Sequence, residues 1–458
     1  MRLQEGFSSI GQSAGFGCTL DEMTYHGEMP VKGIRWIVLV ILVSASFIAY
    51  VLRTNVSIVG EMMMHDLGMN EMQLGLVFSA FAAGYAIFQF PGGILGDRFG
   101  ARFTITAIAI LWGLLTILTA VIPGTDVWSV GSIVLALMVT RFLVGAVHAP
   151  FFPVSIGGTI ASWFPVKQWG LANGLTSTGL TLGAAATAPL VVWLMTAYGW
   201  RAALLITAPA GFVIAFVYYA FVTDDPKNHT KITAEEIATI ASDRPAEGMV
   251  PSKGAWKLVL KNRNVLLITC SYFCMNYVFY LFFSWFFFYL VDVKGFTPTQ
   301  AGLLTAAQWV FGAIGATAGG VICDYLVRRY GIGFGPRRLT MTGLILSAIF
   351  LSVGAISDHV YLSVGMLCLS FACNQLTEAP IWVATMAVSG RHAPMATGIL
   401  NTGANIPGVL GGVMVPFTAA ILGWPAAMVT GSVFAIIGAL LWLFIKADEP
   451  MGAPLSKL

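Results

Sequence analysis

Twelve apolar segments, each long enough to cross a lipid bilayer as a helix, recur along this chain of 458 residues. The hydrocarbon core of a bilayer is roughly 30 Å thick, so about 20 apolar residues span it as an α-helix. Only 10% of the residues are charged, whereas soluble domains carry about 25%. We therefore predict an all-α membrane protein with twelve transmembrane helices. The segments lie near residues 34–58, 72–94, 103–122, 130–155, 168–197, 201–222, 264–291, 299–325, 338–357, 360–388, 394–421 and 424–446.

The positions of the basic residues predict which side of the membrane each loop faces, because cytoplasmic loops carry an excess of Lys and Arg. If both termini are cytoplasmic, twenty of the 24 basic residues fall on the cytoplasmic side. Arg201 and Lys294 then face outward, and Arg53 and Arg141 lie within the spans. We expect a multi-pass protein of the bacterial inner membrane with both termini in the cytoplasm. The net charge of +3 is too small to indicate a nucleic-acid partner.

Polar segments divide the predicted spans into two groups of six. The first 33 residues lack the apolar run of a cleaved signal peptide. In the linker, Thr233-Ala-Glu-Glu236 has the pattern of a capping box and predicts a short helix. The predicted organisation is a cytoplasmic tail (1–33), an N-terminal six-helix bundle (34–222), a cytoplasmic linker (223–263), a C-terminal six-helix bundle (264–446) and a second cytoplasmic tail (447–458).

Three short motifs recur in corresponding spans of the two groups, about 224 to 230 residues apart. Internal repeats of this kind are typical of transporters whose two halves surround one central path. We interpret the chain as two pseudo-symmetric bundles around such a path. The motif pairs are Gly93-Ile-Leu-Gly-Asp97 with Gly320-Val-Ile-Cys-Asp324, Asn173-Gly174 with Thr397-Gly398, and His148-Ala149-Pro150 with Glu378-Ala379-Pro380.

The loop after the second span has a recognisable pattern. Gly93-x-x-x-Asp97-Arg98-x-Gly100-x-Arg102 resembles the signature loop of the major facilitator superfamily, and the segment from Gly320 to Arg329 is a weaker copy of it. The resemblance covers residues 34–446. It implies the twelve-helix fold of that superfamily and a gating role for this loop, in which Asp–Arg contacts hold the cytoplasmic face in one conformation. The residues assigned to gating are Gly93, Asp97, Arg98, Arg102, Asp324 and Arg328.

Other stretches are similar to the organic anion (anion:cation symporter) family, which includes bacterial sugar-acid permeases and animal vesicular glutamate and sialic acid carriers. This resemblance implies a small organic anion as substrate, protons as the coupling ion and a monomeric protein in the bilayer. The matching stretches are Tyr50-Val-Leu-Arg53-Thr-Asn55, Gln89-Phe-Pro91-Gly-Gly93, Arg141-Phe-Leu-Val-Gly145, Ala149-Pro150-x-x-Pro153 and Ser162-Trp-Phe-Pro165.

Arg53 and Arg141 lie in the middle of predicted spans. An arginine at the centre of a membrane helix costs about 2.5–3.5 kcal/mol even on lenient scales, so it needs a wet cavity or an anionic partner. Its planar guanidinium matches a carboxylate with two hydrogen bonds. Two arginines against one carboxylate within the spans, Glu378, leave a positive charge that an anionic substrate would neutralise. The alternative is that each arginine belongs to a structural ion pair.

Glu378 and His148 are the groups within the spans that can titrate near neutral pH, and they occupy equivalent positions of the two repeats. We expect both near the central path as candidates for proton coupling. The alternatives are a packing role for His148 and a permanent salt bridge for Glu378. The related sugar-acid symporters carry acids just before the first arginine and in the fourth span, where this chain has Leu52 and His148. Coupling, if present, must have been rebuilt around Glu378 and His148.

Polar residues four apart on one helix face suggest the wall of the cavity, although hydrogen bonding between helices is an equally good account of many of them. No paired metal-ligand spacing, nucleotide loop or catalytic pairing is apparent, so we predict no cofactor, no metal and no enzymatic activity. Besides the two arginines, the predicted substrate contacts are Tyr85, Gln89, Asn276, Tyr280, Trp382 and Asn401.

The sequence therefore favours a secondary active transporter that imports a small organic anion, a sugar acid or related carboxylate, together with protons. An exporter or uniporter of organic anions on the same fold is the first alternative. A membrane nutrient sensor is the second, but such a sensor needs an output domain and the tails are short.

Overall fold

The computed structural model describes residues 33–165, 168–241, 259–389 and 393–449. Within these ranges the chain is helical, and twelve helical stretches are long and apolar enough to cross a membrane, which confirms the expected number of spans. Helices before the linker are α1 (Ile34–Asp66), α2 (Glu71–Ala120), α3 (Val130–His148), α4 (Phe151–Val154), the π-helix η1 (Ser155–Ile160), α5 (Ala161–Trp163), α6 (Trp169–Tyr198), α7 (Trp200–Thr207) and α8 (Pro209–Phe221). After the linker elements η3 (Pro226–Asn228) and α9 (Ala234–Ala241) come α11 (Arg263–Phe288), the π-helix η4 (Tyr289–Val293), α12 (Pro298–Tyr330), α13 (Gly335–Ile356), α14 (Val360–Leu376), α15 (Glu378–Ser389), α16 (Ala393–Leu422) and α17 (Trp424–Leu441).

Helical elements and membrane spans do not correspond one to one. α2 holds the second and third spans, joined at Gly100, whose backbone is non-helical (φ 78°, ψ 162°). A side chain on Gly100 would be strained at this φ and would also meet the Asp224 carboxylate at 2.6 Å. That carboxylate accepts a 2.8 Å hydrogen bond from the backbone N–H of Arg102. The sharp turn between the two spans is therefore fixed to the chain that follows α8.

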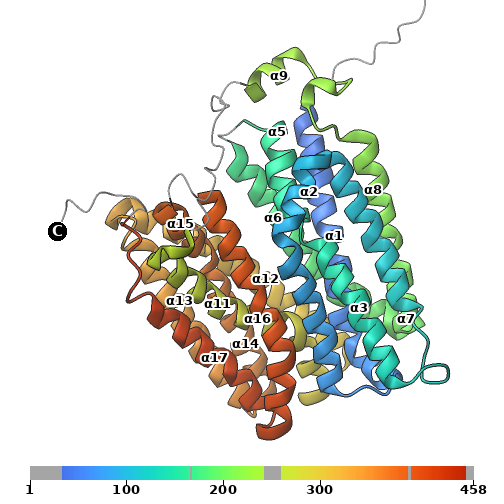
Figure 1. Cartoon of the computed structure of the whole chain (residues 1–458). Coiled ribbons are helices and arrows are strands. Elements are labelled where there is room, and N and C mark those ends of the chain that lie inside the picture. The colour runs from blue at the N-terminus through green and yellow to red at the C-terminus, as the bar shows by residue number, and fades with distance from the viewer. Residues whose placement is uncertain (1–32, 166–167, 242–258, 390–392, 450–458) are drawn as a thin grey trace, which may run out of the picture.

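The helices form two bundles, α1–α8 and α11–α17, which lie side by side (Figure 1). Within the first, α2 packs on α3 and α1 packs on α6; within the second, α13 packs on α14 and α17, and α11 packs on α16. The bundles contact each other mainly through α2 with α16 and α6 with α12, and α1 also contacts α11. We call the side where α1 begins and α9 lies the linker face, and the side where α1 ends and α2 begins the distal face.

The bundles touch closely near the distal face. Gly75 of α2 and Gly412 of α16 stand backbone to backbone, and a side chain on either would overlap the other helix. The Ser79 hydroxyl donates a 2.8 Å hydrogen bond to the carbonyl of Val409. Nearer the linker face, Gly174 and Gly398 have no such neighbour within 4 Å.

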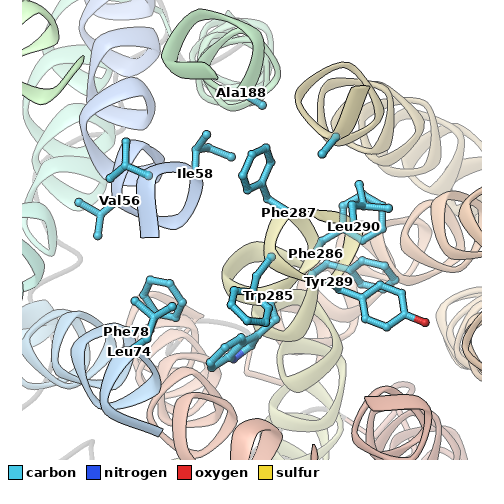
Figure 2. Close-up of a cluster of buried hydrophobic side chains, with 14 of the residues drawn as sticks. Val56, Ile58, Leu74, Phe78, Ala188, Trp285, Phe286, Phe287, Tyr289 and Leu290 are labelled. Carbon is cyan, nitrogen blue, oxygen red and sulfur yellow. The ribbon is translucent and has the colours of Figure 1, made fainter. Parts of the chain in front are cut away.

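A cluster of buried apolar side chains, which we call the distal cluster, closes the same side (Figure 2). Phe78 of α2 and Trp285 of α11 meet edge to face, with ring centroids 5.4 Å apart. Trp285 is fully buried, which indicates that water does not enter between the bundles here. The cluster labelled in Figure 2 is Val56, Ile58, Leu74, Phe78, Ala188, Trp285, Phe286, Phe287, Tyr289 and Leu290.

The linker helix α9 is attached to the first bundle through Glu236. This buried carboxylate accepts hydrogen bonds from the backbone N–H groups of Gly33, Ile34 and Arg35 at 3.1–3.3 Å. The predicted short helix is present, and the Thr233 hydroxyl accepts from the backbone N–H of Glu236 at 3.1 Å. In a capping box the Glu236 side chain would also accept from the backbone N–H of Thr233. Here it caps the N-terminus of α1 instead.

Replacing Gly412 with Leu should prevent the distal face from closing, because the new side chain would overlap Ser79 and the backbone of Gly75. We expect a longer distance between spin labels at positions 126 and 358, measured by pulsed EPR on a cysteine-depleted background. Gly398→Leu is the matched control, because no atom lies within 4 Å of its added Cβ. An unchanged distance in Gly412→Leu would show that this contact does not hold the face shut.

Glu236→Gln should lower thermal stability, because α1 loses a charged cap on three backbone N–H groups. The loss of a helix cap typically costs about 0.5–2 kcal/mol. The measurement is the unfolding temperature of the full chain in nanodiscs. Asp126→Asn, at an exposed distal loop position, is the control for loss of one negative charge, and an equal shift in both variants would contradict the capping role.

Candidate functional site

A cavity of about 210 Å³ lies between the two bundles, and residues from both contribute to its wall. Most residues predicted to bind substrate or protons are found there. Arg141 and Gln89 are the exceptions, because neither lines this cavity. The predicted residues that line it are Arg53, Tyr85, His148, Asn276, Tyr280, Glu378, Trp382 and Asn401.

Arg53 projects from α1 into a group of aromatic rings. Its side chain is 6% exposed, and one guanidinium nitrogen is 3.4 Å from the Tyr50 hydroxyl oxygen. Within the described ranges, no Asp or Glu oxygen lies within 4.0 Å of it. The predicted alternative of a structural ion pair is therefore not seen for Arg53. Its Cζ lies 5.0–5.2 Å from the ring centroids of Tyr50, Phe81, Tyr85 and Phe283.

Arg141 of α3 lies behind the cavity wall. Its Nη2 donates a 3.2 Å hydrogen bond to the backbone carbonyl of Arg53, and its Cζ lies 5.0 Å from the ring centroid of Phe81. Arg141 is 4% exposed, and it too has no carboxylate within 4.0 Å among the described residues. In this conformation Arg141 holds the backbone of α1 at Arg53 and adds a second positive charge behind it. Gln89, which is also buried, leaves its Oε1 without a protein partner.

His148 ends α3 and stacks on Trp112, with ring centroids 4.5 Å apart. Its Nε2 lies 3.0 Å from the backbone carbonyl of Ala49. A carbonyl oxygen can only accept a hydrogen bond, so Nε2 must carry the proton. Nδ1 makes no hydrogen bond of standard geometry and is the atom of this ring that can gain a proton. Both predicted roles, packing and proton exchange, are therefore compatible with this position.

Glu378 lies at a break in the tenth span. α14 ends at Leu376 and α15 begins at Glu378, so the carboxylate sits in the first turn of a helix, where the helix dipole favours negative charge. Gln375 contacts this carboxylate, with its Nε2 3.5 Å from Oε2. In the described part of the chain, no Lys, Arg or His is within 4.0 Å of this carboxylate. The permanent salt bridge considered as an alternative is therefore not present.

The second bundle supplies an amide- and hydroxyl-rich wall. Tyr280 donates a 2.8 Å hydrogen bond to Oδ1 of Asn405, and Trp382 donates from Nε1 to the Tyr272 hydroxyl at 3.3 Å. Tyr50 and Tyr272 also line the cavity but were not predicted. The sequence did contain a signal for each of them. Tyr50 is three residues before Arg53, and Tyr272 is four residues before Asn276, so each pair lies on one helix face.

The described side chains among the predicted gating residues contact backbone carbonyls and an aromatic ring. Arg102 donates from Nε and Nη2 to the carbonyl of Tyr219 at 2.9 and 2.6 Å, which ties the loop to α8. Arg328 donates to the backbone carbonyl of Asp324 rather than to its carboxylate, and Arg98 lies over Phe99. The surroundings of Gly93 and the side chain of Asp97 lie outside what the structure describes, so their gating role stays a prediction.

Comparison with known protein families decides the class of this fold. The model of the Major Facilitator Superfamily matches residues 42–334 and 332–457. The chain belongs to the major facilitator superfamily. This membership confirms the predicted twelve-helix fold and a multi-pass membrane protein. It also identifies the chain as a transporter rather than an enzyme.

Curated relatives cover nearly the whole chain. It is 31% identical over 428 residues to a "Probable sulfoacetate transporter SauU" of Cupriavidus necator, covering 92% of this chain and 96% of that protein. It is 30% identical to a "Probable galactarate/D-glucarate transporter GudP" of Bacillus subtilis, covering 82% and 84%. The fold is also similar to a solved bacterial homologue of the human lysosomal transporter Spinster, with a TM-score of 0.73, 17% identity, and 92% and 98% coverage.

Proposed function

We propose that this member of the superfamily imports a small organic anion, a sugar acid or related carboxylate, together with protons. The observation that carries the proposal is Arg53, a buried arginine on the cavity wall with no carboxylate within 4.0 Å among the described residues. A positive charge in this surrounding costs free energy until an anion neutralises it. The guanidinium geometry favours a carboxylate or another oxyanion.

The opposite wall supports a hydroxylated substrate. Asn276, Asn401 and Trp382, which come from the second bundle, offer donors and acceptors to the cavity. A sugar acid has a carboxylate for the arginine and hydroxyl groups for the amides. The cavity volume of about 210 Å³ is below the range of drug-sized pockets, which favours a small molecule. The relatives named as probable transporters of galactarate/D-glucarate and of sulfoacetate support an organic anion as the substrate.

Glu378 and His148 support proton coupling. Both line the cavity with Arg53, and Glu378 has no basic partner in the described ranges that would keep it permanently ionised. Importing one negative charge against an inside-negative potential costs about 2.3 kcal/mol per 100 mV. One co-transported proton cancels this cost for a monovalent anion, and a second makes the potential favourable. Titratable groups beside the anion site meet this requirement.

The transport cycle follows from the position of the contacts between the bundles. The excess of basic residues supports a cytoplasmic linker face, and with that orientation a closed distal face would correspond to the inward-open state. The two bundles would then rock about the cavity, opening the distal cluster as the linker face closes. Binding of the anion between them, with contacts from both, would favour the intermediate in which both faces are closed.

Arg53→Ala should weaken anion binding at least about tenfold, because a hydrogen bond to a charged group contributes about 1.5–3 kcal/mol and 1.4 kcal/mol is a factor of ten. The measurement is uptake into proteoliposomes from a panel of radiolabelled sugar acids and short dicarboxylates under an inward proton gradient. Arg329→Gln, at the exposed linker face, is the control. Undiminished uptake by a correctly folded Arg53→Ala variant would show that the anion does not bind at Arg53.

Glu378→Gln should abolish uptake driven by the proton gradient while leaving exchange of labelled for unlabelled substrate intact, because exchange requires no net proton movement. The two assays are run on the same proteoliposomes, with a protonophore as the reference for lost coupling. His148→Asn is measured in parallel to decide between the two candidate carriers. Gradient-driven uptake that survives in both variants would favour a uniporter of anions over the proposed symporter.

A further inference from the structure

Three side chains with metal-binding atoms meet at the distal face, away from the cavity. Glu61 and His65 belong to the last turns of α1, and Asp292 belongs to η4 at the end of α11. His65 Nε2 lies 3.5 Å from Oε1 of Glu61 and 3.8 Å from Oδ1 of Asp292. One ligand atom from each lies within 4.8 Å of the others. We call these three residues the distal triad.

Among the residues that the structure describes, the carboxylates of the triad have no basic partner within 4.0 Å besides the imidazole. Arg201 is engaged by the Asp66 carboxylate at 2.7 Å, and Lys294 donates its Nζ to the carbonyl of Ser357 at 3.1 Å. A further carboxylate, Glu71 at the start of α2, is close enough to Asp292 for their charges to interact. Among the described residues, no Lys or Arg lies within 4.0 Å of Glu61 or Asp292. Closing the distal face thus gathers like charges, which a cation would neutralise.

The donor set indicates which cation fits. Glu61 and His65 are four residues apart, so both side chains leave the same face of α1, a spacing that two ligands of one metal ion commonly have. One imidazole and two carboxylates suit Zn²⁺ or a similar divalent transition ion, whereas Mg²⁺ and Ca²⁺ take oxygen ligands. Three protein ligands leave a fourth position for water. His65 and Asp292 are exposed and Glu61 is partly exposed, which allows an ion to enter from solution.

We propose that the distal triad binds a divalent transition-metal ion such as Zn²⁺ and that the bound ion holds the distal face closed. Glu61 and His65 move with the first bundle and Asp292 with the second, so the three donors can bind one ion only while the bundles are in contact. An ion that binds one conformation better than the other shifts the equilibrium toward it. The ion therefore acts as an inhibitor that traps the transporter with its distal face shut.

The first test is direct and does not depend on the substrate. ZnCl₂ is titrated by calorimetry into the purified full chain in nanodiscs, with an affinity tag that contains no histidine. We expect one Zn²⁺ per chain, with affinity reduced at least about tenfold in His65→Ala and in Asp292→Asn, because each removes a ligand. Asp358→Asn, at another exposed distal position, should bind as the parent does. Equal binding by all four proteins, or no binding by the parent, would overturn the site.

The second test concerns conformation. Pulsed EPR distances between labels at positions 126 and 358 are recorded with and without Zn²⁺, and with Mg²⁺ as the control ion. Zn²⁺ should increase the population with the short distal distance in the parent and leave Asp292→Asn unchanged. If Zn²⁺ binds the parent but the distance distribution does not change, the proposed trapping is wrong even if the site exists. Failure of anion uptake in the earlier assays would affect neither measurement.

Discussion

The buried charge of Arg53, which has no carboxylate within 4.0 Å among the described residues, is the constraint around which this structure is organised. A guanidinium in the middle of an apolar bundle must be stabilised by its surroundings, and four aromatic rings at 5.0–5.2 Å provide part of that stabilisation without cancelling the charge. Arg141 binds the backbone carbonyl of Arg53, so the position of the charge is fixed from behind. What remains is an electropositive wall that faces a cavity shared by both bundles.

The sequence predicted the spans well because their length and hydropathy are set by the bilayer and are local properties. It also predicted Arg53, Tyr85, Tyr280, Trp382 and Glu378 as a group, since polar residues within apolar spans must face a wet or polar site. It could not tell which of Arg53 and Arg141 lines the cavity. Both are mid-span arginines, and only the packing of α3 behind α1 places one at the wall and the other behind it.

Contacts between distant segments account for the other differences. The segment around Glu236 has the pattern of a capping box, but no local signal reveals that the carboxylate reaches the start of α1. Asp292 lies more than two hundred residues from Glu61 and His65, so their spacing along the chain could not group them. The break of the tenth span at Thr377 was likewise not anticipated, although it is what places Glu378 in a first helical turn.

The attachment of α9 has a consequence for how this chain could be divided. Glu236 makes the linker helix part of the first bundle, with Trp163 donating to the carbonyl of Thr223 as a second tie. A polypeptide cut after α9 would leave the first fragment with its own helix cap, and the second fragment would begin ahead of α11. A cut before Thr233 would separate α1 from the carboxylate that caps it. Two separately expressed halves should therefore reassemble better from the later cut, even though both cuts fall in the same polar linker.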